Sequence, residues 1–269
     1  MQLYDTHCHL QDERLAPDLE SVMERAATCG VLRLRCCACE EADWPAVAHL
    51  AIRYPAVRPA YGLHPWYLDR RTPGWEALLR ARLNAEPSAI VGEIGLDHAI
   101  DTPARPLQAE ILKTQLQVAA DLGRPASIHC RKAWGSLLAL LRSLPRLPPA
   151  LIFHAYSGDA ELIPLLVDLN GWFSFCGSLT REGNRRGRAS AARVPDERVL
   201  LESDAPDLSP RQAPADRPNE PAHLVHTLAE LALCRNQPVE QVAGLTWQNA
   251  CRVFKDPDPA GAPPSQPIC

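Results

Sequence analysis

The chain has 269 residues, of which 46% are hydrophobic and 22% charged, and this composition excludes a chain that is disordered throughout. Its 28 basic and 32 acidic side chains give a formal charge of −4, so no global field draws the protein onto nucleic acid. No apolar run approaches the ~18 residues of a membrane span, and the acidic, histidine-rich first residues are unlike a signal peptide. We therefore expect a soluble, cytoplasmic protein with no membrane partner.

Short apolar runs alternate with longer helical patterns along the chain. The runs are mostly continuous in apolar character, which is typical of parallel strands covered on both faces. They predict strands at residues 2–8, 31–37, 57–63, 89–95, 126–130, 150–155, 171–176 and 198–203.

Helical spacing of apolar residues fills the segments between these runs. It predicts helices at residues 15–28, 42–53, 75–83, 107–120, 134–144, 161–169, 222–234 and 239–254. Strands that each lead into a helix predict an α/β fold, a single (β/α)8 TIM barrel over residues 1–256 with an extra C-terminal helix. The proline-rich residues 257–269 are expected to form a short disordered tail.

The ten cysteines are mostly embedded in apolar runs. In a long chain without an export signal we interpret them as buried free thiols instead of disulfides. Cys36, Cys37 and Cys39 are close enough in sequence to chelate a metal, but they lack a partner pair at zinc-finger spacing. Their role stays open.

Histidines fall at or beside the ends of the predicted strands, where a barrel carries its chemistry. His7 and His9 are two residues apart on one strand, so both side chains point to the same face. Glu93 lies in an otherwise apolar strand, where an ionised carboxylate is costly unless it is paired or bound to metal. Together with His129, His154 and Asp204 they offer four imidazoles and two carboxylates.

Six such ligands exceed what one tetrahedral zinc uses. They predict two divalent metal ions, with Glu93 bridging them and a water or hydroxide between them. Imidazole-rich ligation favours Zn, Mn, Fe or Ni, and Mg remains an alternative in activity.

Seven segments then carry a resemblance to a known family. In chain order they are residues 5–10, 62–65, 92–97, 128–131, 153–158, 200–206 and 219–221. They are similar to the successive signatures of the TatD family of metal-dependent deoxyribonucleases, over about residues 4–254. This resemblance implies an amidohydrolase-type TIM barrel with a binuclear site and nuclease activity, often exonucleolytic.

The same resemblance implies a role for each matching residue. It assigns His7, His9 and Asp204 to one metal, His129 and His154 to the second, and Glu93 to both as the bridge. His64 and Arg131 fall on family positions near the substrate phosphate. The chain departs from the family pattern at residues 98–101 and at Lys132, which bears on the substrate more than on the metals.

From these residues we expect hydrolysis of phosphodiester bonds in DNA, from ends or in single strands, by a monomeric enzyme. Asp204 is expected to act as the catalytic base beside Glu93, with Glu202 or a water chain as the alternative base.

The main alternative is an amidohydrolase or lactonase acting on a small cyclic amide or ester on the same barrel. Many such enzymes bridge their metals with a carbamylated lysine on strand four, whereas this chain has only three lysines, none in that strand. A binding protein with a relict site is a second alternative, and the presence of all six candidate ligands argues against it.

Two features remain undecided between function and structure. Arg181, Arg185, Arg186, Arg188 and Arg193 form either a phosphate-binding patch or a solvated helix face. Trp66 and Trp134 either stack nucleobases or cap the barrel.

Overall fold

The computed structural model describes residues 1–257, and residues 258–269, most of the predicted tail, lie outside the described part. All of its strands belong to one parallel sheet in which each strand pairs with the next one in the chain. The strands are β1 (Leu3–Cys8), β2 (Val31–Cys37), β3 (Val57–Tyr61), β4 (Ile90–Asp97), β5 (Ala126–Arg131), β6 (Leu151–Phe153), β7 (Gly171–Phe175) and β8 (Val199–Leu201). The predicted TIM barrel is confirmed.

Backbone hydrogen bonds bring the first and last strands together. The amide of Asp204, just after β8, donates to the His7 carbonyl at 2.9 Å, and the His9 amide donates to the Ala205 carbonyl at 2.7 Å. These hydrogen bonds join β1 to the segment after β8 and so close the barrel at the carboxyl ends of its strands, next to candidate site residues.

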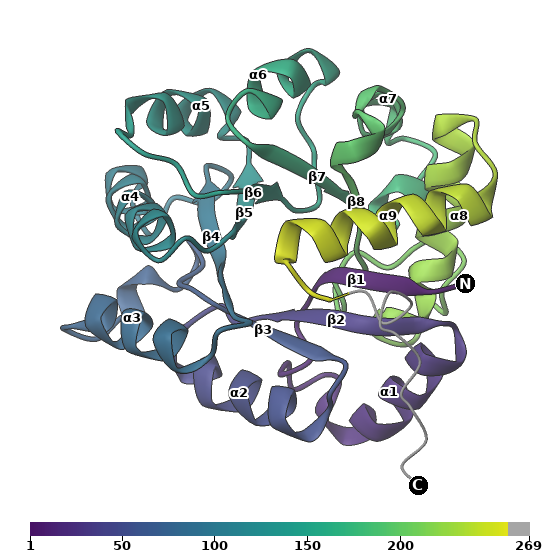
Figure 1. Cartoon of the computed structure of the whole chain (residues 1–269), viewed down its shortest axis with the longest axis horizontal. Coiled ribbons are helices and arrows are strands. Elements are labelled where there is room, and N and C mark those ends of the chain that lie inside the picture. The colour runs from purple at the N-terminus through teal and green to yellow at the C-terminus, as the bar shows by residue number, and fades with distance from the viewer. Residues whose placement is uncertain (258–269) are drawn as a thin grey trace, which may run out of the picture.

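Helices form a ring outside the strands (Figure 1). They are α1 (Leu19–Thr28), α2 (Trp44–Arg53), α3 (Trp75–Ala85), α4 (Arg105–Asp121), α5 (Trp134–Ser143), α6 (Ile163–Val167), α7 (Arg185–Arg193), α8 (Leu224–Arg235) and α9 (Val239–Phe254). None of the helices in residues 1–257 is both long and apolar enough to cross a membrane.

The last helix, α9, crosses the amino-terminal end of the barrel (Figure 1). Its Trp247 and Phe254 rings pack on Tyr4, at the start of β1. The fully buried Arg35 lies beside them, and it contacts the Tyr4 hydroxyl at 3.0 Å and the Asp256 carboxylate at 3.4 Å. α9 thus covers part of this end of the barrel, and the candidate site residues lie at the opposite end.

The strands are buried along nearly their whole length, and every residue of β4 is buried. This agrees with the continuous apolar runs from which they were predicted. β6 and β8 end two residues earlier than predicted. The residues that follow them leave the sheet ladder and carry the candidate site side chains His154, Glu202 and Asp204.

The predicted helix at 161–169 is shorter in the structure, because a 3-10 turn at Ala160–Leu162 precedes α6. The sequence prediction also missed α7. This helix is rich in arginine and buries only the small residues Gly187, Ser190 and Ala191, so it has no apolar stripe. Asn184 caps it by accepting a hydrogen bond from the Gly187 amide.

Candidate metal centre

Glu93 is the centre of the site, and its two carboxylate oxygens face two different sets of imidazoles. Oε2 lies 3.2 Å from Nε2 of His7 and 3.4 Å from Nε2 of His9. Oε1 lies 3.0 Å from Nδ1 of His129 and 2.7 Å from Nε2 of His154. A carboxylate that touches a separate histidine pair with each oxygen has the arrangement of a bridging ligand.

Asp204 completes the first of these sets. Its Oδ1 lies 3.6 Å from Nε2 of His9 and 3.8 Å from Nε2 of His7. One ligand atom from each of these three residues falls within 4.8 Å of the others, a spacing that could hold an ion. The structure therefore gathers all six predicted metal ligands, from β1, β4 and β5 and from the residues just after β6 and β8.

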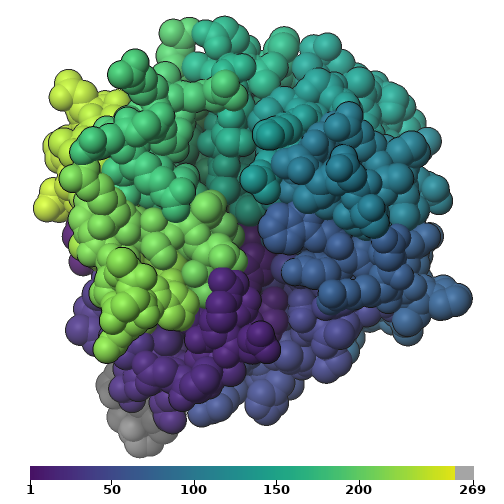
Figure 2. All heavy atoms as spheres, turned by 180° about the vertical axis from the view of Figure 1, so that it is seen from behind, coloured from purple at the N-terminus to yellow at the C-terminus, as the bar shows by residue number. Residues whose placement is uncertain are grey.

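These side chains lie at the end of the barrel opposite α9. Seen from that side, the molecule is hollowed at its centre, between the segments that follow β7 and β8 and those that follow β3 and β4 (Figure 2). The site is thus recessed below a rim of connecting loops, as a barrel fold places it.

Hydrogen bonds on the outer side of two imidazoles determine which nitrogen carries the proton. Nδ1 of His9 lies 2.8 Å from the Cys37 carbonyl, which only accepts, so in the neutral ring the proton lies on Nδ1 and Nε2 carries the lone pair. Nε2 of His129 lies 3.3 Å from the Asp97 carboxylate, so its Nδ1 keeps the lone pair toward Glu93. Both rings therefore present a ligand nitrogen to the centre.

His7 and His154 are also backed by polar groups. Nδ1 of His7 lies 3.0 Å from the Ser127 hydroxyl. Nδ1 of His154 lies 3.7 Å from Oε1 of Glu202, a fully buried carboxylate that accepts the Ala155 amide at 2.5 Å. Glu202 thus stands behind His154, away from Glu93, where it orients the ring.

His64, just after β3, differs from the other histidines. Its Nδ1 accepts the backbone amide of Trp66 at 3.2 Å, which places the proton on Nε2. That nitrogen lies 3.3 Å from Oε1 of Glu93 and can only donate. His64 is therefore a hydrogen-bond donor at the centre, which matches its predicted contact with phosphate better than metal ligation.

Buried glutamines of α4 hold the segments that carry these groups. Gln115 accepts the Leu63 amide at 2.7 Å and donates to the Leu63 carbonyl at 3.1 Å, directly before His64. Gln108 makes the same pair of contacts with the backbone of Asp97, at 2.8 and 3.1 Å. Each glutamine therefore fixes the backbone at or next to a residue of the site, His64 in one case and Asp97 in the other.

Asp204 is fixed by its backbone. Its φ of +56° is in the left-handed region, which residues other than glycine seldom adopt and which recurs at functional sites. The Asn219 side chain donates to the carbonyls of Ser203 and Asp207, both at 2.8 Å, and so clamps the loop on each side of Asp204. Asp5 accepts the Ser203 amide at 2.8 Å and joins this loop to β1.

The charges in the cluster depend on one another. Burial would raise the pKa of Glu93, but the facing histidines His154, His64 and His7 hold it well below its usual range. Burial lowers the pKa of His7 and of His64 to about 4. Burial also opposes charge on His154, but Glu93 and Glu202 outweigh it and raise the pKa of His154 well above its ordinary value.

Comparison with known proteins identifies the family. Residues 4–255 match the family described as TatD related DNase. The chain belongs to this family. A relative named 3'-5' ssDNA/RNA exonuclease TatD, from Edwardsiella piscicida, is 33% identical in an alignment of 263 positions that covers 94% of this chain and 99% of the relative.

Two further comparisons agree with the TatD assignment. The crystal structure of YjjV, a TatD homologue from Escherichia coli K12, has a TM-score of 0.89 and 30% identity, and covers 95% of this chain and 98% of that one. A relative from Bacillus subtilis, 28% identical over 94% of this chain and 99% of its own length, has the name Uncharacterized metal-dependent hydrolase YabD. The protein is thus a TatD-type metal-dependent hydrolase that acts on ester bonds, as predicted.

Enzymes of the alternative class, the amidohydrolases, resemble this chain only distantly. A dihydroorotase from Campylobacter jejuni is 16% identical with a TM-score of 0.60, over 96% of this chain and 85% of that one, which shows a shared fold alone. Lys113 lies on the exposed side of α4, and Lys132 and Lys255 follow β5 and α9. In this TatD-type chain the carboxylate that lies between the two histidine pairs is Glu93.

Sequence reasoning quoted Asp97 and Asn219 within motifs but gave them no role, and it considered Glu202 only as an alternative base. Asp97 and Glu202 each follow apolar residues at a strand end, as Glu93 and Asp204 do within their segments. That pattern could have identified them. Nothing in the sequence distinguishes a carboxylate that faces the centre from one that stands behind a histidine.

The structure also bears on the cysteines. The nine cysteines among residues 1–257 are free thiols, as expected. Cys37 Sγ lies 3.4 Å from Nδ1 of His7 and Cys39 Sγ lies 3.6 Å from Nδ1 of His9. Cys36 points instead to Gln11, with its Sγ 3.1 Å from Oε1. Cys37 and Cys39 therefore lie beside the imidazoles, and Cys39 offers a ligand atom within 4.8 Å of ligand atoms of His9 and Glu93.

The arginine cluster is partly paired. Arg186 forms an ion pair with Asp159 at 3.0 Å and Arg188 with Glu230 at 2.5 Å. For Arg186 and Arg188 these ion pairs favour the interpretation as a solvated helix face over a phosphate-binding patch.

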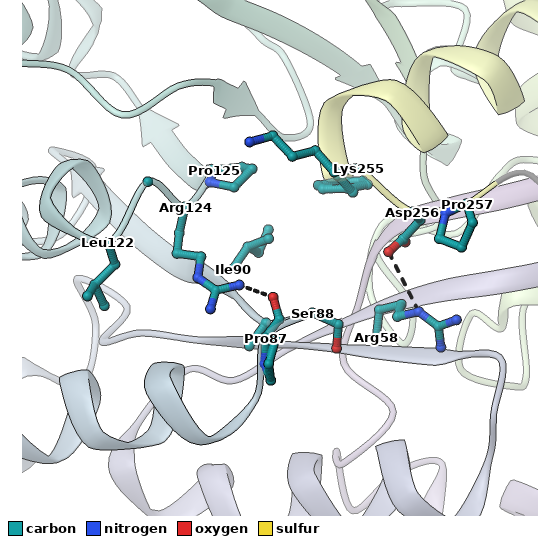
Figure 3. A pocket seen from close by; sticks show the side chains of 13 residues that line it. Arg58, Pro87, Ser88, Ile90, Leu122, Arg124, Pro125, Lys255, Asp256 and Pro257 are labelled. Atoms are coloured by element: carbon teal, nitrogen blue, oxygen red, sulfur yellow. Dashed lines mark hydrogen bonds and ion pairs between the residues drawn. The ribbon is translucent and has the colours of Figure 1, made fainter.

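A cavity of about 500 Å³ lies at the other end of the barrel and holds none of the candidate site residues. It is lined by the starts of β3, β4 and β5 and by the residues that end α9 (Figure 3). Arg124 bonds to the Pro87 carbonyl and Arg58 lies 3.8 Å from Asp256, so two of its cations are already paired within the chain.

Proposed function

We propose that this enzyme hydrolyses phosphodiester bonds at the ends of single-stranded DNA, with two divalent metal ions held by six side chains. The ligand set is His7, His9, Glu93, His129, His154 and Asp204. The proposal rests on the position of the Glu93 carboxylate. One of its oxygens faces His7 and His9, and the other faces His129 and His154.

The donor groups fit divalent metals. The tautomers imposed on His9 and His129 by the Cys37 carbonyl and by Asp97 direct a lone pair toward Glu93. Imidazole-rich ligation favours Zn, Mn, Fe or Ni, with Mg as an alternative in activity. When bound, such ions lower the pKa of water and neutralise charge on phosphoryl oxygens.

Asp204 is proposed as the catalytic base. Water attacks phosphorus, a new P–O bond forms, and the bond from phosphorus to the oxygen of the neighbouring nucleotide breaks. The Asp204 carboxylate accepts the proton that the attacking water loses, and this proton then passes to the leaving oxygen, which departs as a hydroxyl group and regenerates the carboxylate. Its left-handed backbone and the clamp by Asn219 keep this carboxylate fixed beside His7 and His9.

His64 and Arg131 are proposed to bind the phosphate. The Nε2–H of His64 already points at the centre, where it can donate to a phosphoryl oxygen. The Arg131 side chain is 56% exposed and its Nη1 lies 3.9 Å from Asp97, so it stands at the rim of the hollow. Both groups favour the charge that develops on the phosphoryl oxygens during the reaction.

A strand end is favoured as substrate because the centre is recessed below the rim loops (Figure 2). A recessed centre admits the end of a single strand more readily than a duplex. The name of the Edwardsiella relative, a 3'-5' ssDNA/RNA exonuclease, supports an exonuclease and adds RNA and 3' polarity to what should be tested. A cytoplasmic location and a monomeric state remain predictions.

The test is a substrate panel with metal-loaded and chelator-treated enzyme. It includes single-stranded DNA and RNA labelled at either end, duplex DNA, a lactone and dihydroorotate. We expect stepwise shortening of the single strands only in the presence of metal, and little cleavage of the duplex. Hydrolysis of the lactone or cyclic amide alone would overturn the proposal.

A further inference from the structure

Trp66 is the only exposed aromatic side chain among residues 1–257, which include every aromatic residue of the chain. It is 45% exposed, whereas Trp134, the other candidate for stacking, packs on Phe153 and Tyr156 with ring centroids 5.8 and 4.8 Å away. Exposed apolar side chains are common on protein surfaces, so what distinguishes Trp66 is its fixed orientation and its neighbours at the site.

The Trp66 ring is held in one orientation. Its Nε1 donates to Oδ2 of the buried Asp97 at 2.7 Å, and its backbone amide donates to Nδ1 of His64 at 3.2 Å. The ring is nearly perpendicular to the His64 imidazole, with centroids 5.1 Å apart and an angle of 89°. A ring anchored through its polar edge keeps its apolar surface available for contact.

Trp66 also lies beside the proposed phosphate groups. The His64 ring touches Trp66 on one side and, through Nε2, Glu93 on the other. Trp66 and Arg131 both approach Oδ2 of Asp97, and the exposed Lys132 follows Arg131 in the chain. A cationic rim next to a fixed aromatic ring is the combination that binds single-stranded nucleic acid, in which bases stack and phosphates pair with cations.

We propose that Trp66 is the stacking platform for the nucleobase next to the phosphate that is cleaved. This inference rests on the proposed function and deepens it, because it makes the enzyme select phosphodiesters that carry a base at that position. Stacking is tolerant of base identity, so the platform favours nucleic acid over other phosphodiesters without reading sequence.

The experiment compares two oligonucleotides that differ only in whether the terminal nucleotides carry bases or are abasic. Wild-type, Trp66→Phe and Trp66→Leu enzymes are assayed with metal bound, and kcat and KM are measured separately. Ile52→Ala on α2 is the matched control, because Ile52 is also an exposed apolar residue, 83% exposed.

We expect Trp66→Leu to raise KM for the base-containing strand by about ten-fold or more, with KM for the abasic strand nearly unchanged. Trp66→Phe retains a ring and should lie between wild-type and Trp66→Leu. Both variants lose the hydrogen bond to Asp97, so this comparison isolates the ring. The stacking role would be overturned if Trp66→Phe and Trp66→Leu lowered kcat equally, on the base-containing and on the abasic strand alike. That result would mean that Trp66 acts by positioning Asp97.

Binding without turnover provides a second readout. A short single strand should quench the fluorescence of chelator-treated wild-type protein, and the Trp66→Phe variant should lose that quenching. If the wild-type enzyme cleaves strands but Trp66 shows no quenching, the stacking role of Trp66 is refuted and the proposed function stands. Failure of the wild-type enzyme to cleave any strand would overturn the proposed function, and the platform with it.

Discussion

The Asp97 carboxylate lies 3.3 Å from Nε2 of His129, on the side of the imidazole that faces away from Glu93. The contact determines the tautomer of His129 and aims its Nδ1 at the centre, so Asp97 acts on metal through another residue. Asp97 also accepts from Trp66 and from the Ala99 amide, which together with His129 hold its pKa well below the usual range despite burial.

Replacement of Asp97 by asparagine should therefore weaken metal binding. The amide keeps the shape but loses the charge that orients His129, and the loss of such an outer partner typically costs about 10- to 100-fold in metal affinity. Calorimetric titration of the chelator-treated, metal-free protein with zinc measures this loss of affinity. Asp101→Asn, an exposed acid in the following loop, is the control and should behave as wild-type. Equal affinities for Asp97→Asn and the control would refute the role of Asp97.

Replacement of Asp204 by asparagine should reduce turnover more than metal content. The amide oxygen can still face His7 and His9, but it cannot accept the proton of the attacking water. We expect kcat to fall by a factor of roughly 10² or more. Metal content by elemental analysis and kcat on a single strand are measured on the same preparation.

The control is Asp207→Asn, since Asp207 is exposed and pairs only with Arg14 at 2.9 Å in the described structure. A near wild-type kcat in Asp204→Asn with full metal content would exclude Asp204 as the base. Glu202 lies behind His154 and would then have to act through that ring.

Metal affinity should rise with pH. Burial opposes charge on His9 and His154, but contacts with Cys39, Asp204 and Glu93 for the first, and with Glu93 and Glu202 for the second, raise both pKa values well above 6.5. In the metal-free protein these rings hold protons near neutral pH, and a metal has to displace them. Zinc titration in buffers of different ionisation enthalpy should show proton release on binding. Affinity that is constant from pH 6 to 8.5 would contradict this charge arrangement.

Replacement of Asn219 by alanine should destabilise the protein as well as the site. Two buried contacts to the carbonyls of Ser203 and Asp207 are lost, and an unsatisfied buried group costs about 1–3 kcal/mol. We expect a lower Tm and a lower kcat, because the loop around Asp204 loosens. Gln212→Ala in the exposed part of the same loop is the control. An unchanged Tm would show that the clamp contributes little.

Sequence patterns predicted the barrel and the gathering of the six ligands because both depend on local periodicity and on parallel strands ending at the same edge. They missed α7, since a helix that packs through Gly187 and Ala191 has no apolar stripe to detect. They placed His129 among the ligands, and the family resemblance placed His64 near the phosphate, but neither gave the physical basis of the difference. That difference is set by the Trp66 amide and by Asp97, contacts that only the folded chain creates.

They also left Trp66 and Trp134 equivalent. The two tryptophans differ only in which neighbours cover them, and burial by residues distant in the chain leaves no local signature.

The backbone contact between His7 and Asp204 joins residues from the two ends of the folded domain. His7 and His9 emerge from a ribosome first, and Asp204 emerges only after all eight strands have been made. No contiguous half of the chain contains both histidine pairs around Glu93 together with Asp204. A nascent or proteolytically cut chain therefore has histidines without a complete centre, and the full set of six side chains comes together only when the last strand docks against the first.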